Sequence, residues 1–178
     1  ERFRYRPSIL IPVFLVVLVA SMPVLAESIT AAIKDGKVNF DLRYRYEYVD
    51  QSGFDHTANA QTTRLRTGYK NGTRYNFLVM HELAANEGLG SENYNSTANG
   101  HTQFPVVADP EDAELNQAYL AWKGWEGTTF SAGRQRLILD NHRFVGNVGW
   151  RQLEQTFDAV TIKSKFTEKT NFFYSHVS

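Results

Sequence analysis

Residues 38–49 read Val38-Asn39-Phe40-Asp41-Leu42-Arg43-Tyr44-Arg45-Tyr46-Glu47-Tyr48-Val49. Every even position is apolar or aromatic, and four of the six odd positions are charged. Because successive side chains of a β-strand point to opposite faces, this alternation predicts one strand with an apolar face and a charged face. A strand of about twelve residues exceeds the usual length and matches what is needed to cross a membrane obliquely. A soluble β-sandwich would show the same alternation, so this strand alone leaves both all-β classes open.

The bulk composition excludes several classes of protein. The 178 residues carry a formal net charge of zero, so no global basic field attracts nucleic acid, and no nucleic-acid partner is expected. Cysteine is absent, which excludes a disulfide scaffold and thiolate metal sites. The compartment must therefore be inferred from another feature.

The N-terminal segment has the layout of a secretory signal peptide. Three arginines at positions 2, 4 and 6 precede an apolar run over residues 9–20, and the segment ends with Val24-Leu25-Ala26. Residues 9–26 approach the length of a transmembrane anchor, but Pro12 and Pro23 interrupt them and no basic stop-transfer cluster follows. We expect a helical signal peptide over residues 1–26, cleaved after Ala26, and a mature chain over residues 27–178.

The rest of the chain predicts further strands near residues 60–70, 73–82, 113–123, 128–137 and 155–166, and from residue 171 onward. Asn71-Gly72 is a strong hairpin signal. Placing Leu65 and Tyr69 on one face with Val79 requires an odd number of turn residues, so we expect a three-residue turn with Gly72 in the left-handed region. Arg134 and Arg136 share their parity with Phe130, an apolar residue of the same strand, which predicts a bulge at Gly133 or emergence of the strand into the next loop.

The connections between these strands alternate in length. Long polar loops are predicted over residues 50–59, 83–112 and 138–153, with short turns between them. An up-and-down barrel with short periplasmic turns and long outer loops explains this rhythm, whereas Greek-key crossings do not. The predicted fold is an all-β, antiparallel, up-and-down transmembrane β-barrel, seen here as an unclosed sheet of about seven strands. For the acidic group of residues 109–112, an exposed loop tip is favoured over a divalent-cation site.

Several motifs resemble the alginate-export family of outer-membrane porins. They are Glu114-Leu115-Asn116-Gln117-Ala118-Tyr119-Leu120, Gly133-Arg134-Gln135, Asp140-Asn141-His142-Arg143-Phe144-Val145-Gly146, Trp150-Arg151-Gln152 and Gln155-Thr156-Phe157-Asp158-Ala159-Val160, and the strand of residues 40–47 is also similar. The resemblance implies a monomeric barrel with more strands than this chain supplies, so a truncated N-terminal copy is expected. It also implies the cell outer membrane as location, and three partners: outer-membrane lipid, the barrel-assembly machinery, and an anionic polysaccharide or small anionic solute.

A pore of this kind selects solutes through the fixed charges of its lumen. The candidate pore-lining residues are Arg43, Arg45, Arg64, Arg66, Arg74, Arg134, Arg143 and Arg151. A guanidinium group binds carboxylates such as those of uronic acids through two parallel hydrogen bonds. The alternative is an ion-pair ladder that braces the wall, because Asp41, Glu47 and Glu82 share the same predicted face. The loop over residues 138–153 is expected to fold inward as a constriction.

Catalysis is not expected, because none of the five histidines lies in a recognisable nucleophile or zinc motif. Asn141-His142 is the nearest approach to a base, and the sequence supplies no partner for it. No cofactor or metal is expected. A structural or adhesive barrel stays open as an alternative, and an outer-membrane hydrolase stays open as a weaker one.

Overall fold

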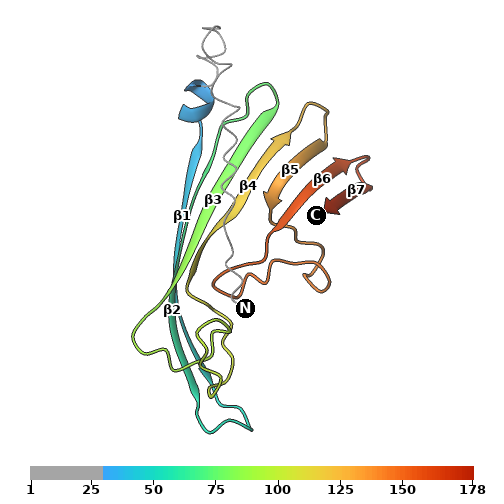
Figure 1. The fold of residues 1–178 in the computed structure, drawn as a ribbon. Coiled ribbons are helices and arrows are strands. Elements are labelled where there is room, and N and C mark those ends of the chain that lie inside the picture. The colour runs from blue at the N-terminus through green and yellow to red at the C-terminus, as the bar shows by residue number, and fades with distance from the viewer. Residues whose placement is uncertain (1–29) are drawn as a thin grey trace, which may run out of the picture.

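A computed structural model describes residues 30–178, which form one antiparallel sheet of seven strands in sequential order (Figure 1). The strands are β1 (Lys37–Val49), β2 (Ala58–Lys70), β3 (Phe77–Gly88), β4 (Asp112–Trp122), β5 (Thr128–Gln135), β6 (Phe157–Lys165) and β7 (Asn171–Val177). The sheet is curved, and β1 and β7 lie at its two edges without pairing to each other. The all-β, unclosed architecture is confirmed. The expected signal peptide over residues 1–26 lies outside the described residues.

The two faces of the sheet differ in polarity, as the alternation in residues 38–49 predicts. The even residues of β1 are all exposed, from Val38 at 76% to Tyr48 at 55%. The odd residues Arg43, Arg45 and Glu47 are partly covered. Cross-strand pairs such as Arg43 with Arg64 carry the same polarity across to β2. We call the face with Arg43 and Arg64 the inner face and the opposite, apolar face the outer face.

The predicted alternation of loop lengths is confirmed. Short connections over residues 71–76, 123–127 and 166–170 lie at one end of the sheet, where a short helix over residues 30–34 also packs (Figure 1). The longer connections, over residues 50–57, 89–111 and 136–156, follow the opposite ends of the strands. Within residues 30–178 no helix is long and apolar enough to cross a membrane.

The hairpin between β2 and β3 differs from the prediction. The prediction that odd-numbered residues of the two strands share a face is confirmed, because Tyr69 pairs with His81. However, β3 begins at Phe77 rather than at residue 73, and it extends to Gly88. The left-handed residues are Tyr75 (φ 49°) and Asn76 (φ 66°), and not Gly72. They form a two-residue turn closed by paired backbone hydrogen bonds between Arg74 and Phe77.

Gly72 meets a different requirement from the left-handed turn that was predicted. Its N–H donates to the Ala32 carbonyl at 2.9 Å. A Cβ atom at position 72 would lie 2.7 Å from the Cβ of Asp35. The glycine is therefore needed for the close approach of the segment around residues 30–36, a long-range contact that local sequence does not reveal.

The bulge occurs in β4 and not in β5. Glu82 pairs with Gln117 and Leu83 pairs with Leu115, so Asn116 is the extra residue. Asn116 and Gln117 are consecutive in sequence, yet both are buried. Strand β5 keeps a continuous register through Gly133, so the bulge predicted there is wrong. The alternative, that the strand emerges into the next loop, is confirmed for Arg136, because β5 ends at Gln135.

The loop over residues 89–111 is partly buried, and the prediction of a wholly exposed loop is wrong. Tyr94 and Val107 pack against Ala58 and Ala60 and form a small apolar cluster with them. Asp109, expected at a solvated tip, is 1% exposed. Its burial follows from contacts with the loop over residues 136–156, which lies distant in sequence.

Candidate pore-lining site

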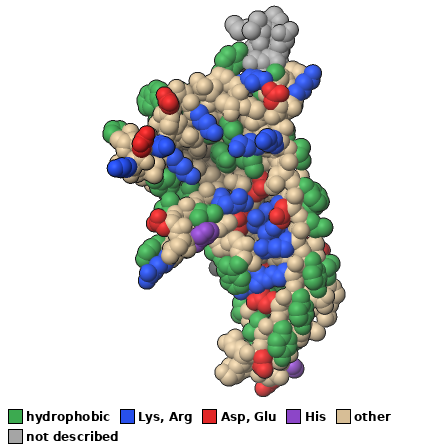
Figure 2. Space-filling model, turned by 180° about the vertical axis from the view of Figure 1, so that it is seen from behind, with side chains coloured by type: hydrophobic (Ala, Val, Ile, Leu, Met, Phe, Trp, Pro, Cys, Tyr) green, Lys and Arg blue, Asp and Glu red, His purple; other side chains and the backbone are tan. Residues whose placement is uncertain are grey.

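A column of basic side chains interleaved with acidic ones follows the long strands on one side of the molecule (Figure 2). These charges belong to the inner face of β1 to β4 and to the loop over residues 136–156. The loop reaches this face through Gln152, whose side-chain amide donates to the Thr62 carbonyl at 3.1 Å and to its hydroxyl at 2.8 Å. The expectation that this loop folds inward is thus met by the geometry of its second half.

Arg43 attaches β1 to the loop. Its Nε donates to the Gln152 side-chain oxygen at 2.8 Å, and its terminal nitrogens donate to the carbonyls of Gly149 at 3.1 Å and Trp150 at 3.3 Å. It also donates to the Arg151 carbonyl. Among residues 30–178, no carboxylate lies within ion-pair distance of Arg43. Its positive charge is held by neutral acceptors.

Arg45 and Arg151 flank the Trp150 ring, at 5.0 and 4.0 Å from its centroid. Both arginines also face Glu47 and the buried Asp109, which lies 3.4 Å from Arg45 and 3.6 Å from Arg151. The second carboxylate oxygen of Asp109 accepts the backbone N–H of Gln152 at 2.9 Å. Two positive groups therefore share two acids and one aromatic ring.

Arg64 and Arg66 lie beside these groups on β2, and both are almost fully buried. Arg64 pairs with Asp41 of the neighbouring strand. Arg66 lies 3.4 Å from Glu154 and donates to the Gln152 carbonyl at 3.3 Å. Among residues 30–178, the Nε atoms of both arginines have no hydrogen-bond partner.

Glu154 is the centre of the network that attaches the loop to β3 and β4. Both of its oxygens accept from Arg136 Nε at 2.9 Å, and Asn116 donates to it at 2.7 Å. Asn116 also donates to Glu82, at the same distance of 2.7 Å, and Arg136 lies 3.3 Å from Glu82. The bulge in β4 makes this possible, because it turns Asn116 to the inner face beside Gln117.

The charge balance at Glu154 favours its ionised form. Burial opposes ionisation, but the hydrogen bonds from Arg136 and Asn116 and the nearby positive charges outweigh it, so the pKa of Glu154 lies below its ordinary value. Burial likewise disfavours the charged form of Arg136, and its bonds to Glu154 overcome that penalty and raise the pKa of Arg136. The two charges therefore support each other.

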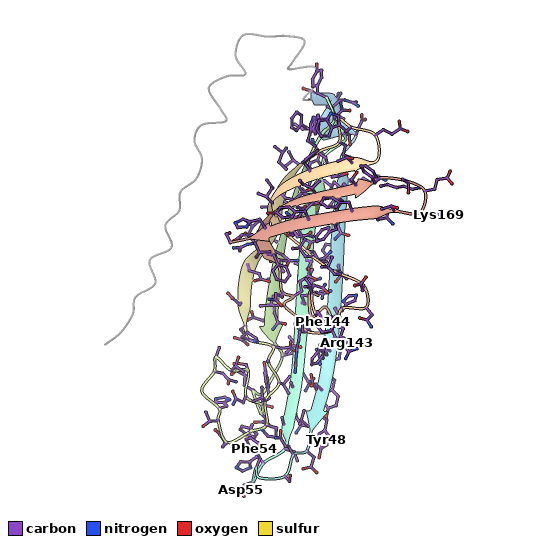
Figure 3. All side chains as sticks on the ribbon, turned by 90° about the vertical axis from the view of Figure 1, so that its right-hand side faces the viewer. Tyr48, Phe54, Asp55, Arg143, Phe144 and Lys169 are labelled. Carbon is purple, nitrogen blue, oxygen red and sulfur yellow. The ribbon has the colours of Figure 1, made fainter. Side chains whose placement is uncertain are left out.

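Five of the eight arginines proposed from sequence gather in this cluster: Arg43, Arg45, Arg64, Arg66 and Arg151. Three lie elsewhere. Arg74 pairs with Asp35 near the short turns. Arg134 binds Asp158 through two bonds of 2.9 and 2.8 Å on the outer face, which is a correction to its expected inward position. Arg143 lies beside Phe144 on an exposed part of the loop (Figure 3).

The residues of the cluster that were missed from sequence include Asp109, Asn116, Arg136, Gln152 and Glu154. Arg136 and Glu154 lie outside the regular strands, so strand parity gives no information about them. Gln152 is fully buried and contacts Thr62, a residue ninety positions away. The available signal was chemical, since a chain with many inward arginines requires acids to neutralise them.

The cluster thus contains six arginines, including Arg136, and five carboxylates. The carboxylates are Asp41, Glu47, Glu82, Asp109 and Glu154. Within residues 30–178, no group of three or more histidine or acidic residues could hold a metal ion. Chemically, the site can bind and repel charged solutes, and its small excess of positive charge is carried by Arg43.

Comparisons with known proteins supply the identity. Comparison with curated proteins finds no relative that matches the chain. Residues 35–173 match the profile of the Alginate export family, whose proteins are outer-membrane channels. The match covers all of β1 to β6, both loops of the inner-face cluster and the start of β7. The chain therefore belongs to the alginate export family.

Proposed function

We propose that this chain forms part of the wall of an outer-membrane channel that passes anionic polysaccharide or small uronate-type solutes. The proposal rests on the position of Arg43. Its charged guanidinium lies on the inner face and is held by Gln152 and by carbonyls of the loop over residues 136–156. A positive group held at an inward loop attracts carboxylates passing it. Membership of a family of outer-membrane polysaccharide channels supports the same reading.

The dimensions of the outer face support a transmembrane position. From Val38 to Tyr48 its apolar residues cover about 33 Å of strand, at about 3.3 Å per residue. A strand tilt near 40° reduces this to about 25 Å, the height of the apolar band of outer-membrane barrels. The short turns would then face the periplasm and the long loops the exterior. Outer-membrane lipid and the barrel-assembly machinery are the corresponding partners, and the full-length barrel is proposed to be monomeric.

The arginines divide into two groups in this proposal. Arg64, Arg66 and Arg136 are the wall braces, because each is buried or bonded against a carboxylate. Arg43, Arg45 and Arg151 are the proposed selective residues, since they lie where the loop meets β1. Residues 1–26 are proposed to act as the cleaved signal peptide of residues 27–178.

Reversal potentials of the full-length pore in planar bilayers test this function. Arg43→Ala is expected to reduce anion preference, because it removes a charge that has no carboxylate within ion-pair distance among residues 30–178. Arg74→Ala is the matched control, since that arginine pairs with Asp35 at the short-turn end. Unchanged anion preference in Arg43→Ala would reject Arg43 as a selective residue, and the absence of conductance would favour an adhesive barrel.

A further inference from the structure

A groove lined by aromatic side chains crosses the outer face of β5, β6 and β7 close to their short turns. Its volume is about 690 Å³, which is the size of a ligand pocket. Thr128 and Ser164 form its floor as a cross-strand pair with a hydroxyl–hydroxyl bond of 2.7 Å. Its aromatic lining comes from the β4–β5 hairpin through Trp125 and Phe130, and from the β6–β7 hairpin through Phe166 and Phe172. Two small side chains between larger aromatic ones create the depression.

The aromatic wall is a packed unit. The rings of Trp125 and Phe130 meet edge to face with centroids 5.4 Å apart, and Trp122 lies within 6 Å of both. Such packing holds the wall in one position without a bound molecule. The groove is thus a preformed cavity on a face that, for the channel proposed above, contacts lipid.

One acidic side chain, that of Glu126, borders this apolar groove. It lies at the turn end, where the Lys165 N–H donates to the Gly127 carbonyl at 2.8 Å. Lys165 follows Ser164 in β6, so its side chain points to the inner face and does not neutralise the groove. Within residues 30–178, Glu126 has no ion-pair partner. An apolar cavity with one free negative charge at its rim is complementary to a molecule with an ammonium group and a hydrocarbon chain.

We propose that the groove binds one zwitterionic glycerophospholipid of the phosphatidylethanolamine type. The acyl chain lies over Thr128 and Ser164 between the aromatic walls, and the ammonium meets Glu126, which repels an anionic head group. The orientation rests on the function proposed above, which puts the short turns at the periplasmic leaflet. Because all contacts lie on the outer face, strands added beyond β7 would extend the sheet without covering the groove.

Native mass spectrometry of the purified full-length protein tests this site. The probes are dioleoyl phosphatidylethanolamine and dioleoyl phosphatidylglycerol, which share acyl chains and differ in head group. Wild type is expected to bind one phosphatidylethanolamine in preference to phosphatidylglycerol. Ser164→Leu fills the floor of the groove and is expected to weaken phosphatidylethanolamine binding roughly tenfold. Glu126→Gln is expected to bind both lipids equally, because it keeps the groove and removes the charge that selects the head group. Tyr46→Ala removes an exposed outer-face aromatic outside the groove and should leave binding unchanged.

Equal binding by wild type and Ser164→Leu would overturn the proposal, as would a dimer that forms through this groove in place of lipid binding. Trp125→Ala gives a second route if Ser164→Leu fails to fold, because it opens the wall and leaves the floor intact. Single-channel conductance separates the two proposals. Conductance without groove-dependent lipid refutes only the lipid site, and lipid binding without conductance refutes only the channel.

Discussion

Glu154→Gln is the sharpest test of how the inward loop is held. The glutamate accepts two hydrogen bonds from Arg136 Nε and one from Asn116, and Arg66 lies 3.4 Å away. Glutamine keeps the shape and one acceptor but removes the charge. Arg136 still faces Glu82, whereas Arg66 has no other carboxylate within ion-pair distance among residues 30–178.

The magnitude follows from the burial of the pair. Removing one partner of a buried ion pair costs about 3–5 kcal/mol, and the contacts that glutamine keeps reduce the expected loss of loop attachment to about 2 kcal/mol. A loss of this size raises the population with a detached loop about thirtyfold. The barrel strands should stay intact, because the change affects attachment of the loop and leaves the backbone pairing between strands unaltered.

Limited trypsin digestion followed by mass spectrometry measures that population. Cleavage after Arg151 requires its side chain to leave Glu47, Asp109 and the Trp150 ring. We expect this cleavage to accelerate about thirtyfold in Glu154→Gln, in proportion to the detached population. Glu168→Gln, in the exposed turn between β6 and β7, is the control and should leave the rate unchanged. An unchanged rate in Glu154→Gln would refute the reasoning.

Three further changes test other parts of the structure. The pKa of Glu154 is lowered in the folded state, so the stability that its charge gives to the loop is complete above its ordinary pKa of 4.5 and is lost as the pH falls through the folded pKa. Single-channel conductance should therefore change below pH 4.5 in wild type and not in Glu154→Gln. Gly72→Ala should destabilise the contact with residues 30–36 by about 1–3 kcal/mol, seen as faster proteolysis after Lys34 or Lys37, because its Cβ would lie 2.7 Å from that of Asp35. Leu42→Arg should lower the unfolding free energy in lipid vesicles by about 2–4 kcal/mol, and no change would contradict a lipid-facing position.

The strands and their faces were predictable because the signal is local. In β1 every second residue must suit an apolar or a polar face, so parity alone places Leu42 and Arg43 on opposite sides. The rhythm of loop lengths then gave the up-and-down order. Arg134 was misplaced because the predicted bulge overrode the parity that it shares with Phe130. The strand keeps its register, and an ion pair with Asp158 holds the charge on the outer face.

The loops could not be predicted, because their positions depend on contacts that are distant in sequence. Asp109 is buried only because Gln152 and two arginines meet it from other segments. Asn116 faces inward because of a bulge that no glycine or proline marks. The family resemblance was confirmed by the match over residues 35–173, but it gave no information on which arginine pairs with which acid.

Cysteine scanning of β1 tests the central claim, that its odd residues line a conducting lumen, most directly. These 178 residues contain no cysteine, and any cysteine elsewhere in the full-length protein is replaced by serine, so each introduced thiol is the only one. Single-channel current is recorded from Leu42→Cys, Arg43→Cys, Tyr44→Cys and Arg45→Cys before and after a membrane-impermeant, charged thiosulfonate reagent. We expect the reagent to change the current at positions 43 and 45 and to leave positions 42 and 44 unaffected. Modification of the current at the even positions, or at all four equally, would contradict the account.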